Sequence, residues 1–203
     1  MNTIRSICVY CGSSPGRSDI YLKAGQILGR SIAQAGLQLV YGGGARGVMG
    51  AVAAGAMRAG GKVTGIIPQF LMDKEATRTA LERLDDLVVT DNMHQRKHKM
   101  FEKSDAFVAL PGGIGTVEEI IEIMTWAQLG HHRKPIVFGN IGGFWDPMLT
   151  LLDHMRAEGF IHTSHLVDPL VVDAADAIVP AILAAAVADG TPMQGEASVI
   201  DNL

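Results

Sequence analysis

The sequence lacks the features that mark several large classes of protein. Its 203 residues include two cysteines and 5% aromatic residues, and no apolar run is long enough to span a bilayer. The first residues lack the apolar core of a secretory signal, so we expect a cytoplasmic location and no membrane partner. A formal net charge of −4 gives no electrostatic basis for nucleic-acid binding.

The two cysteines have the C-x-x-C spacing that is also found in redox and metal sites. Redox motifs of this kind open a helix, whereas residues 7–11 have the apolar character of a strand. Because strand residues three apart point to opposite faces, Cys8 and Cys11 are expected to be reduced and unpaired. His94 and His98 lack the glutamate of an H-E-x-x-H motif, so no metal site is expected either.

Short apolar runs alternate with helical patterns along the chain, which predicts a parallel sheet with helices on both faces. We expect one α/β domain over residues 1–190 and a flexible C-terminal tail at 191–203. Strands are predicted at 6–10, 37–41, 62–68, 87–89, 105–110, 135–139 and 170–172, and helices at 18–35, 48–59, 93–104, 115–130, 145–158 and 175–188.

Three glycine-rich loops, at residues 11–16, 42–47 and 111–115, each follow a predicted strand. Parallel strands end at one edge of a sheet, where proteins of this class bind their ligands. A glycine loop that leads into a helix presents backbone N–H groups to a phosphate. None of the loops matches the dinucleotide signature G-x-G-x-x-G with its acidic residue. Together they predict a phosphate-binding crevice of nucleotide size.

Two cations and two carboxylates are candidates for chemistry at this edge. Helical spacing carries Arg96 and Lys97 toward the packed side of a basic helix, where a cation needs an anionic partner. That partner is a structural carboxylate, a ligand phosphate or Glu119. Glu118 and Glu119 are expected in the first turn of the helix after the third loop. Glu118 there suits a partner of the helix dipole, whereas Glu119 lies on an apolar flank beside the glycines.

The helix after the third loop also carries a candidate contact surface. By helical spacing, Ile123, Trp126 and Leu129 are expected to be exposed. Exposed apolar side chains in a row often mark a protein–protein interface. They predict a homodimer that packs through the helix at 115–130.

Several motifs resemble those of the LOG (Lonely Guy) family. Residues 111–119, P-G-G-I-G-T-V-E-E, match its P-G-G-x-G-T-x-x-E signature, and residues 93–97, M-H-Q-R-K, match its second motif. Residues 41–50 resemble its first glycine loop, and 125–130 resemble its helix end. The similarity extends from residue 6 to about residue 172. These proteins were formerly labelled lysine decarboxylases, a label that the absence of a cofactor lysine does not support here.

The resemblance implies a Rossmann-like cytokinin riboside 5′-monophosphate phosphoribohydrolase that is usually homodimeric and needs no cofactor. Such an enzyme hydrolyses the N-glycosidic bond of N6-substituted AMP, or of AMP, to the free base and ribose 5-phosphate. By motif match Glu119 and Arg96 take the catalytic places, and Glu75 resembles a glutamate that contacts the base. Ile114 stands in the substrate site where many relatives carry an aromatic residue. The other expected substrate-binding residues are Ser13, Gly43, Gly44, Lys97, Gly112, Gly113, Gly115, Thr116, Val117, Glu118 and Thr125.

The main alternative is a non-enzymatic carrier or sensor of a nucleotide or of molybdenum cofactor. Related Rossmann modules share P-G-G-x-G-T loops, so the glycines alone do not separate the two functions. A carrier needs the glycine loop but has no need of an acid beside it. The combination of Arg96 with Glu119 therefore favours the hydrolase.

Overall fold

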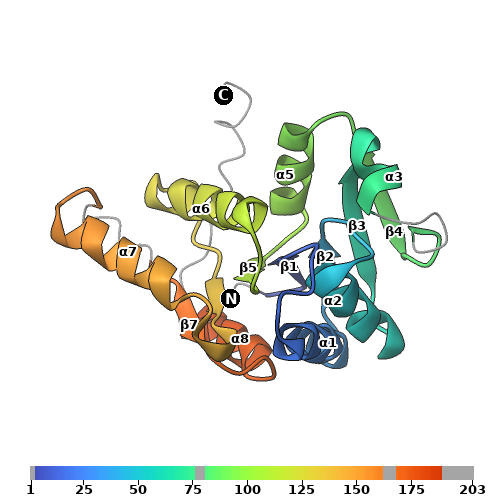
Figure 1. The fold of residues 1–203 in the computed structure, drawn as a ribbon, viewed down its shortest axis with the longest axis horizontal. Coiled ribbons are helices and arrows are strands. Elements are labelled where there is room, and N and C mark those ends of the chain that lie inside the picture. The colour runs from blue at the N-terminus through green and yellow to red at the C-terminus, as the bar shows by residue number, and fades with distance from the viewer. Residues whose placement is uncertain (1–2, 76–80, 162–167, 189–203) are drawn as a thin grey trace.

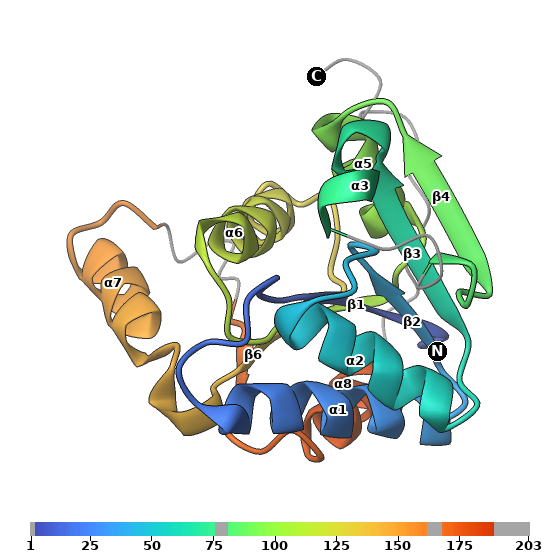
Figure 2. The ribbon, with the colours of Figure 1, turned by 45° about the vertical axis from the view of Figure 1, so that its right-hand side comes forward.

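A computed structural model of the chain describes residues 3–75, 81–161 and 168–188; the predicted tail at 191–203 lies outside them. These residues form a parallel seven-stranded sheet with helices on both faces, as Figures 1 and 2 show. The strand order is β4-β3-β2-β1-β5-β6-β7. The strands are β1 (Ser6–Tyr10), β2 (Gln38–Tyr41), β3 (Val63–Pro68), β4 (Asp86–Thr90), β5 (Ala106–Ala109), β6 (Ile136–Gly139) and β7 (Leu170–Val172).

The predicted α/β class with a parallel sheet is confirmed, and each expected strand and helix is present within a few residues. In the described part of the chain, no helix has both the length and the apolar character needed to cross a membrane. The limit of the domain at residue 190 stays a prediction. The helices are α1 (Asp19–Gln34), α2 (Gly47–Arg58), α3 (Met72–Glu75), α5 (Met93–Glu102), α6 (Ile114–Gln128), α7 (Asp146–Ala157) and α8 (Ile178–Ala188), with short 3-10 turns η1 (Gln69–Leu71) and η2 (Ile141–Gly143).

The core consists of two clusters, one on each face of the sheet. Ile7 and Val9 of β1 pack with α1, α2 and α8, whereas Cys8 and Tyr10 pack with α5, α6 and α7. All four side chains are buried, which explains why β1 reads as a continuous apolar run rather than an alternating one. Full burial of a large apolar side chain stabilises the fold by about 1.5–3 kcal/mol.

The two cysteines behave as their strand spacing predicts. Both are buried and free, Cys8 in one core cluster and Cys11 in the other. Burial raises the pKa of the Cys11 thiol well above its usual range, so it stays protonated near neutral pH. The prediction that the two side chains point to opposite faces of the sheet is confirmed.

Helix ends follow the local signals in the sequence. Ser18 caps α1, and its hydroxyl accepts a hydrogen bond from the Ile20 N–H at 3.4 Å. Asn92 caps α5 and accepts from the Gln95 N–H at 2.9 Å. Beyond the end of α1, Gly36 has a φ of +71°, a conformation that favours glycine.

The strand order changes direction between β1 and β5. From β1 the chain moves outward through β2, β3 and β4, and then returns through α5 to place β5 beside β1. The loops that follow β1 and β5 therefore lead to helices on opposite faces of the sheet, α1 and α6. In open α/β sheets such a point opens a crevice at the carboxyl edge of the strands.

The prediction of an exposed apolar row on α6 is wrong for two of its three residues. Ile123 is only 1% exposed, and Trp126 packs edge-on against Phe101 with 5.0 Å between ring centroids. The reason is that α5 and the turn after α6 cover this flank, with His132 hydrogen-bonded to the Ile123 carbonyl. Leu129 remains 65% exposed. The homodimer through this helix stays a prediction, supported by less apolar surface than the sequence suggested.

Candidate functional site

The three glycine loops lie side by side at the carboxyl edge of the sheet, after the neighbouring strands β2, β1 and β5. The Gly12 N–H donates to the Pro111 carbonyl at 3.1 Å, and the Gly12 carbonyl accepts from the Met49 N–H at 3.1 Å. A Cβ atom on Gly12 would lie 3.2 Å from the Gly112 Cα. The first loop thus connects the other two at a distance that only a small residue allows. Their predicted convergence is confirmed.

The loop after β5 leads into α6 with open space around its backbone. Gly113 is the N-cap residue and makes no side-chain cap, and both Gly113 and Gly115 are exposed with no atom within 4 Å of an added Cβ. The N–H groups of a first helical turn have no acceptor inside the helix, and the helix dipole adds positive character. Thr116 is buried against Gly112, and Ile114 is 89% exposed. This end of α6 is a surface on which an anion can bind.

The two glutamates do not lie in the first turn of α6, as the sequence suggested. Because α6 already begins at Ile114, its first turn contains no acidic residue, and Glu118 and Glu119 stand in the second turn. The dipole of a helix acts mainly within its first and last turns. Stabilisation of the dipole therefore does not account for either carboxylate.

The side chain of Arg96, on α5, extends to the carboxyl edge of the sheet, where the glycine loops lie. It is 6% exposed, and its Nη2 donates to the Gly42 carbonyl at 3.1 Å. Its Nη1 lies 3.7 Å from the Met93 sulfur, and its Nε is buried without a hydrogen-bond partner among the described residues. A buried donor left unpaired costs about 1–3 kcal/mol. The predicted burial of Arg96 is confirmed, and its guanidinium retains a donor that suits an anionic ligand.

Glu119 is half-buried, and its charge acts on the end of β1. Burial raises the pKa of Tyr10 well above its usual range, and the Glu119 carboxylate raises it further. Burial also raises the pKa of Cys8, where Glu119 adds to the rise and Arg96 opposes it. The helices that carry the predicted catalytic pair, α5 and α6, both pack over Cys8 and Tyr10 of β1.

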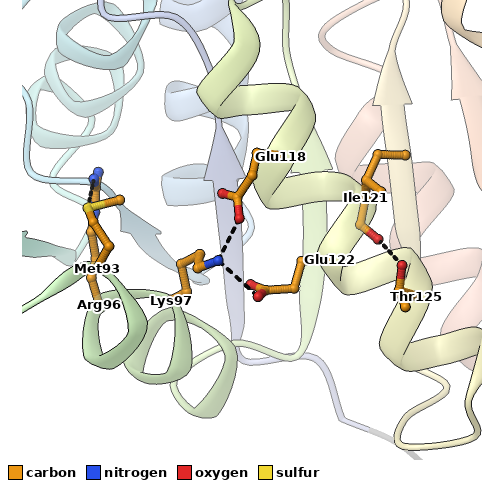
Figure 3. A network of polar contacts seen from close by, with 7 residues as sticks. All are labelled: Met93, Arg96, Lys97, Glu118, Ile121, Glu122 and Thr125. Atoms are coloured by element: carbon orange, nitrogen blue, oxygen red, sulfur yellow. Dashed lines mark hydrogen bonds and ion pairs between the residues drawn. The ribbon is translucent and has the colours of Figure 1, made fainter. Parts of the chain in front are cut away.

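Lys97 contacts carboxylates of α6 and not the glycine loop (Figure 3). Its Nζ donates to Glu118 Oε1 at 2.6 Å and to Glu122 Oε1 at 2.9 Å. Burial lowers the pKa of Lys97, but the two hydrogen-bonded carboxylates outweigh it and the net pKa is raised. Of the partners considered for this cation, the structural carboxylate is the one found.

Thr125 does not join the other predicted site residues. Its Oγ1 donates to the Ile121 carbonyl at 2.8 Å within the same helix, and the residue is exposed. At 1.5 Å per residue it stands roughly 16 Å along the helix from Ile114. Within one copy of the chain, this distance separates Thr125 from the glycine loop.

The remaining predicted residues differ in their burial. Gly43 and Gly44 are buried, and Gly43 has a φ of +77° with an added Cβ only 3.0 Å from the Ile67 Cβ. Ser13 is exposed on the loop after β1. Val117 is half-buried, and its N–H donates to the Gly113 carbonyl. Glu75 is the last residue of α3, and its side chain lies outside what the structure describes.

Sequence reasoning missed a polar network at the end of β6. Asn140 Nδ2 donates to Asp146 Oδ1 at 2.9 Å and to Asp173 Oδ1 at 3.1 Å. Its Oδ1 accepts from the Trp145 N–H at 2.8 Å, and the Trp145 indole donates to the Ala109 carbonyl at 3.0 Å. The one sequence signal that could have indicated this network was an asparagine, Asn140, directly after a predicted strand. The network ties α7 to the ends of β5 and β6, beside the third glycine loop.

No metal centre is found in the described ranges, where no group of three or more histidines, cysteines, aspartates or glutamates is placed to hold an ion. The carboxylates of the edge are instead bonded to protein donors. Glu118 and Glu122 share Lys97, and Asp146 and Asp173 share Asn140.

Comparison with known sequences relates the chain to one family. A sequence model described as "Possible lysine decarboxylase" matches residues 49–182. The chain is 46% identical over 157 residues to the cytokinin riboside 5′-monophosphate phosphoribohydrolase LOG of Oryza sativa subsp. japonica, which covers 77% of this chain and 64% of the rice protein. It is 45% identical over 157 residues to LOG7 of Arabidopsis thaliana, a protein of the same name, covering 77% and 71%. The chain thus spans just under two thirds of the rice protein.

Comparison with solved structures supports the fold alone. A molybdenum cofactor carrier protein from Chlamydomonas reinhardtii superposes with a TM-score of 0.67 at 21% identity, covering 92% of this chain and 99% of that one. A molybdenum cofactor binding protein from Rippkaea orientalis gives 0.63 at 20% identity, with coverage of 90% and 98%. At such identities the likeness extends to the backbone and not to the ligand.

Proposed function

Since the chain belongs to the family of the "Possible lysine decarboxylase" model, which is the family of the LOG proteins, we propose that it is a nucleoside 5′-monophosphate phosphoribohydrolase. Its substrates are cytokinin riboside 5′-monophosphates, AMP or both, and its products are the free base and ribose 5-phosphate. The reaction places it among the N-glycosyl hydrolases. The relatives that bear this activity in their names share 45–46% of their residues with the chain over the aligned part.

The observation that carries the proposal is the position of Arg96 beside the glycine loops. Its buried Nε has no partner among the described residues, while its Nη2 is fixed on the Gly42 carbonyl. A guanidinium held in this way suits a phosphate or carboxylate oxygen. We assign it to the substrate phosphate, to the orientation of Glu119, or to both.

The 5′-phosphate is proposed to bind at the N-terminus of α6. Gly113 and Gly115 leave open space above the free N–H groups of the first turn, and Gly112 and Thr116 pack beneath them. A phosphate fixed there holds the ribose against the second turn of the same helix, where Glu119 stands. Ser13, Gly43, Gly44, Ile114 and Val117 complete the proposed walls of the site.

Glu119 is proposed to act at C1′ of the ribose. In the reaction the C1′–N bond breaks and its electron pair leaves with the base. Water supplies the hydroxyl that adds to C1′ and the proton that the base takes up. The transition state resembles an oxocarbenium ion, which a carboxylate stabilises either by its charge or by forming a covalent bond. Both roles require Glu119 to be ionised and close to C1′.

The test is the release of free base from AMP and from isopentenyladenosine monophosphate by the purified chain. We expect the wild type to release base and Glu119→Gln to lose at least about 100-fold in kcat while it keeps the fold and AMP binding, because the amide carries no charge. Glu158→Gln, an exposed site at the end of α7, serves as the control and should match the wild type. Normal turnover by Glu119→Gln would contradict the assigned role, and AMP binding without base release by the wild type would favour a carrier.

A further inference from the structure

Two consecutive residues of α5 connect it to two different parts of the site. Arg96 bonds the Gly42 carbonyl in the loop after β2, and Lys97 bonds Glu118 and Glu122 on α6, which follows β5. Figure 3 shows the two side chains leaving α5 in different directions, with Lys97 reaching toward α6. Helix α5 is therefore fixed to both sides of the crevice through adjacent residues.

The two carboxylates that Lys97 contacts lie on either side of Glu119 along α6. Glu118 and Glu122 are one turn apart on α6, and Glu119 stands between them along the axis. A single ammonium that bonds both carboxylates fixes the rotation of this turn as well as its distance from α5. The rotation of the turn decides where the Glu119 carboxylate points.

The same contacts argue against a phosphate on Lys97. The Lys97 side chain is 11% exposed, and the two carboxylates that it bonds leave this cluster with a net charge of −1. A phosphate placed beside two carboxylates is repelled. Lys99 differs in each respect: its side chain is 46% exposed, and it pairs at 2.7 Å with Glu102 on its own helix.

We infer that Lys97 is a positioning residue, which sets Glu119 relative to Arg96 through Glu118 and Glu122 and does not touch the substrate. The inference rests on the proposed function, since it assigns Lys97 a task in that reaction. It replaces the expectation that Lys97 binds substrate directly. Misplacement of a reacting group by about 1 Å can lower a rate on the order of 100-fold while the bound substrate keeps its other contacts.

The experiment compares Lys97→Met, Lys97→Arg, Glu122→Gln and the double variant Lys97→Met/Glu122→Gln in AMP hydrolysis. We expect Lys97→Met to lower kcat about 10- to 100-fold with KM within about threefold of the wild type. Lys97→Arg, which can still bond both carboxylates, should recover most of kcat. The double variant should be no slower than Lys97→Met, because both changes remove the same contact. Lys99→Met is the matched control and should leave kcat and KM unchanged.

A binding measurement keeps the test independent of turnover. AMP affinity is measured calorimetrically in the Glu119→Gln background, with and without Lys97→Met. If Lys97→Met changes the AMP affinity of the Glu119→Gln variant by less than about threefold, the positioning role is supported. A loss of affinity of about tenfold or more overturns it, because Lys97 would then be a phosphate ligand. Additive kcat effects in the double variant, or a raised KM with unchanged kcat, overturn it as well. If the wild type releases no base, the proposed function fails, while the affinity comparison still decides whether Lys97 contacts the nucleotide.

Discussion

The glycine loops after β2 and β5 look alike in sequence and differ in the space around them. In the loop after β2, Gly42 and Gly43 are buried, and an added Cβ on Gly42 would overlap Arg96 Nη2. In the loop after β5, Gly113 and Gly115 are exposed and have no atom within 4 Å of an added Cβ. One loop is glycine-rich because it is crowded, and the other because its backbone is left accessible.

This difference separates two tasks within the site. The crowded loop offers Gly42 as a fixed carbonyl acceptor for Arg96, so it positions a side chain. The open loop leaves the N–H groups of the first turn of α6 available, so it can bind a ligand through its backbone. Substitutions in the two loops should therefore act by different routes: through the displaced Arg96 in the first loop, and directly on the bound nucleotide in the second.

The largest effect is expected from Gly42→Ala in the crowded loop. The new methyl group would occupy the place of the Arg96 guanidinium, which must move because the Gly42 backbone is fixed in the sheet edge. We expect kcat for AMP to fall at least about 100-fold, with a loss of roughly 1–3 kcal/mol in the free energy of unfolding. Steady-state kinetics and urea unfolding measure the two quantities.

A matched control exists at the opposite edge of the sheet. A Cβ on Gly61 would overlap the Ala33 Cβ, so Gly61→Ala is crowded as well but lies far from the loops. It should destabilise the chain without lowering kcat of the folded fraction. If Gly42→Ala kept full activity, the loop after β2 would be a scaffold only, and Arg96 would not need its present position.

Much of this edge of the sheet could be predicted from the sequence. The alternation of apolar strands and helices gave the parallel sheet, and the strand ends placed the three glycine loops together. Helical spacing also placed Arg96 correctly on the packed side. These predictions depend on local periodicity, which the sequence carries directly.

The contacts between helices could not be predicted in the same way. The partner of Lys97 depends on how α5 packs against α6, and the burial of Ile123 depends on the turn that contains His132. The start of α6 was placed too late, so Glu118 was mistaken for a partner of the helix dipole. Each error concerns a tertiary contact or a helix boundary, neither of which a helical wheel specifies.

The next effect is expected on stability alone, from acid at the other end of α6, which leaves both loops unchanged. His132 is buried, its Nε2 hydrogen-bonds the Ile123 carbonyl at 2.9 Å, and its Nδ1 accepts from the Lys134 N–H. Burial lowers the pKa of His132 to about 4, from a usual value of 6.5. Between these values the unfolded chain binds a proton that the folded chain does not. Stability is thus fully present above pH 6.5 and falls by about 3 kcal/mol as the pH drops to 4.

The measurement is urea unfolding of the wild type and of His132→Gln at pH 7 and at pH 4.5. Carboxylates titrate in the same range, so the difference between the two pH dependences isolates the histidine. We expect the variant to lose less stability on acidification than the wild type. His154→Gln, at an exposed position of α7, serves as the control. An equal acid effect in His132→Gln would show that this histidine does not account for the loss of stability in acid.

The smallest effect on stability, and the one that most sharpens the comparison between the loops, is expected from Gly115→Ala. Nothing crowds this position and it is helical, so alanine should leave the fold intact and raise the free energy of unfolding by about 0.5 kcal/mol. The methyl group would nevertheless stand where the phosphate is proposed to bind, so KM for AMP should rise several-fold with little change in kcat. Gly159→Ala offers the opposite pattern as a control, because its φ of +79° makes alanine destabilising at a site remote from the loops. A Gly115→Ala variant with unchanged KM would place the nucleotide elsewhere, because a methyl group added between the backbone of α6 and a ligand bound to it must weaken binding.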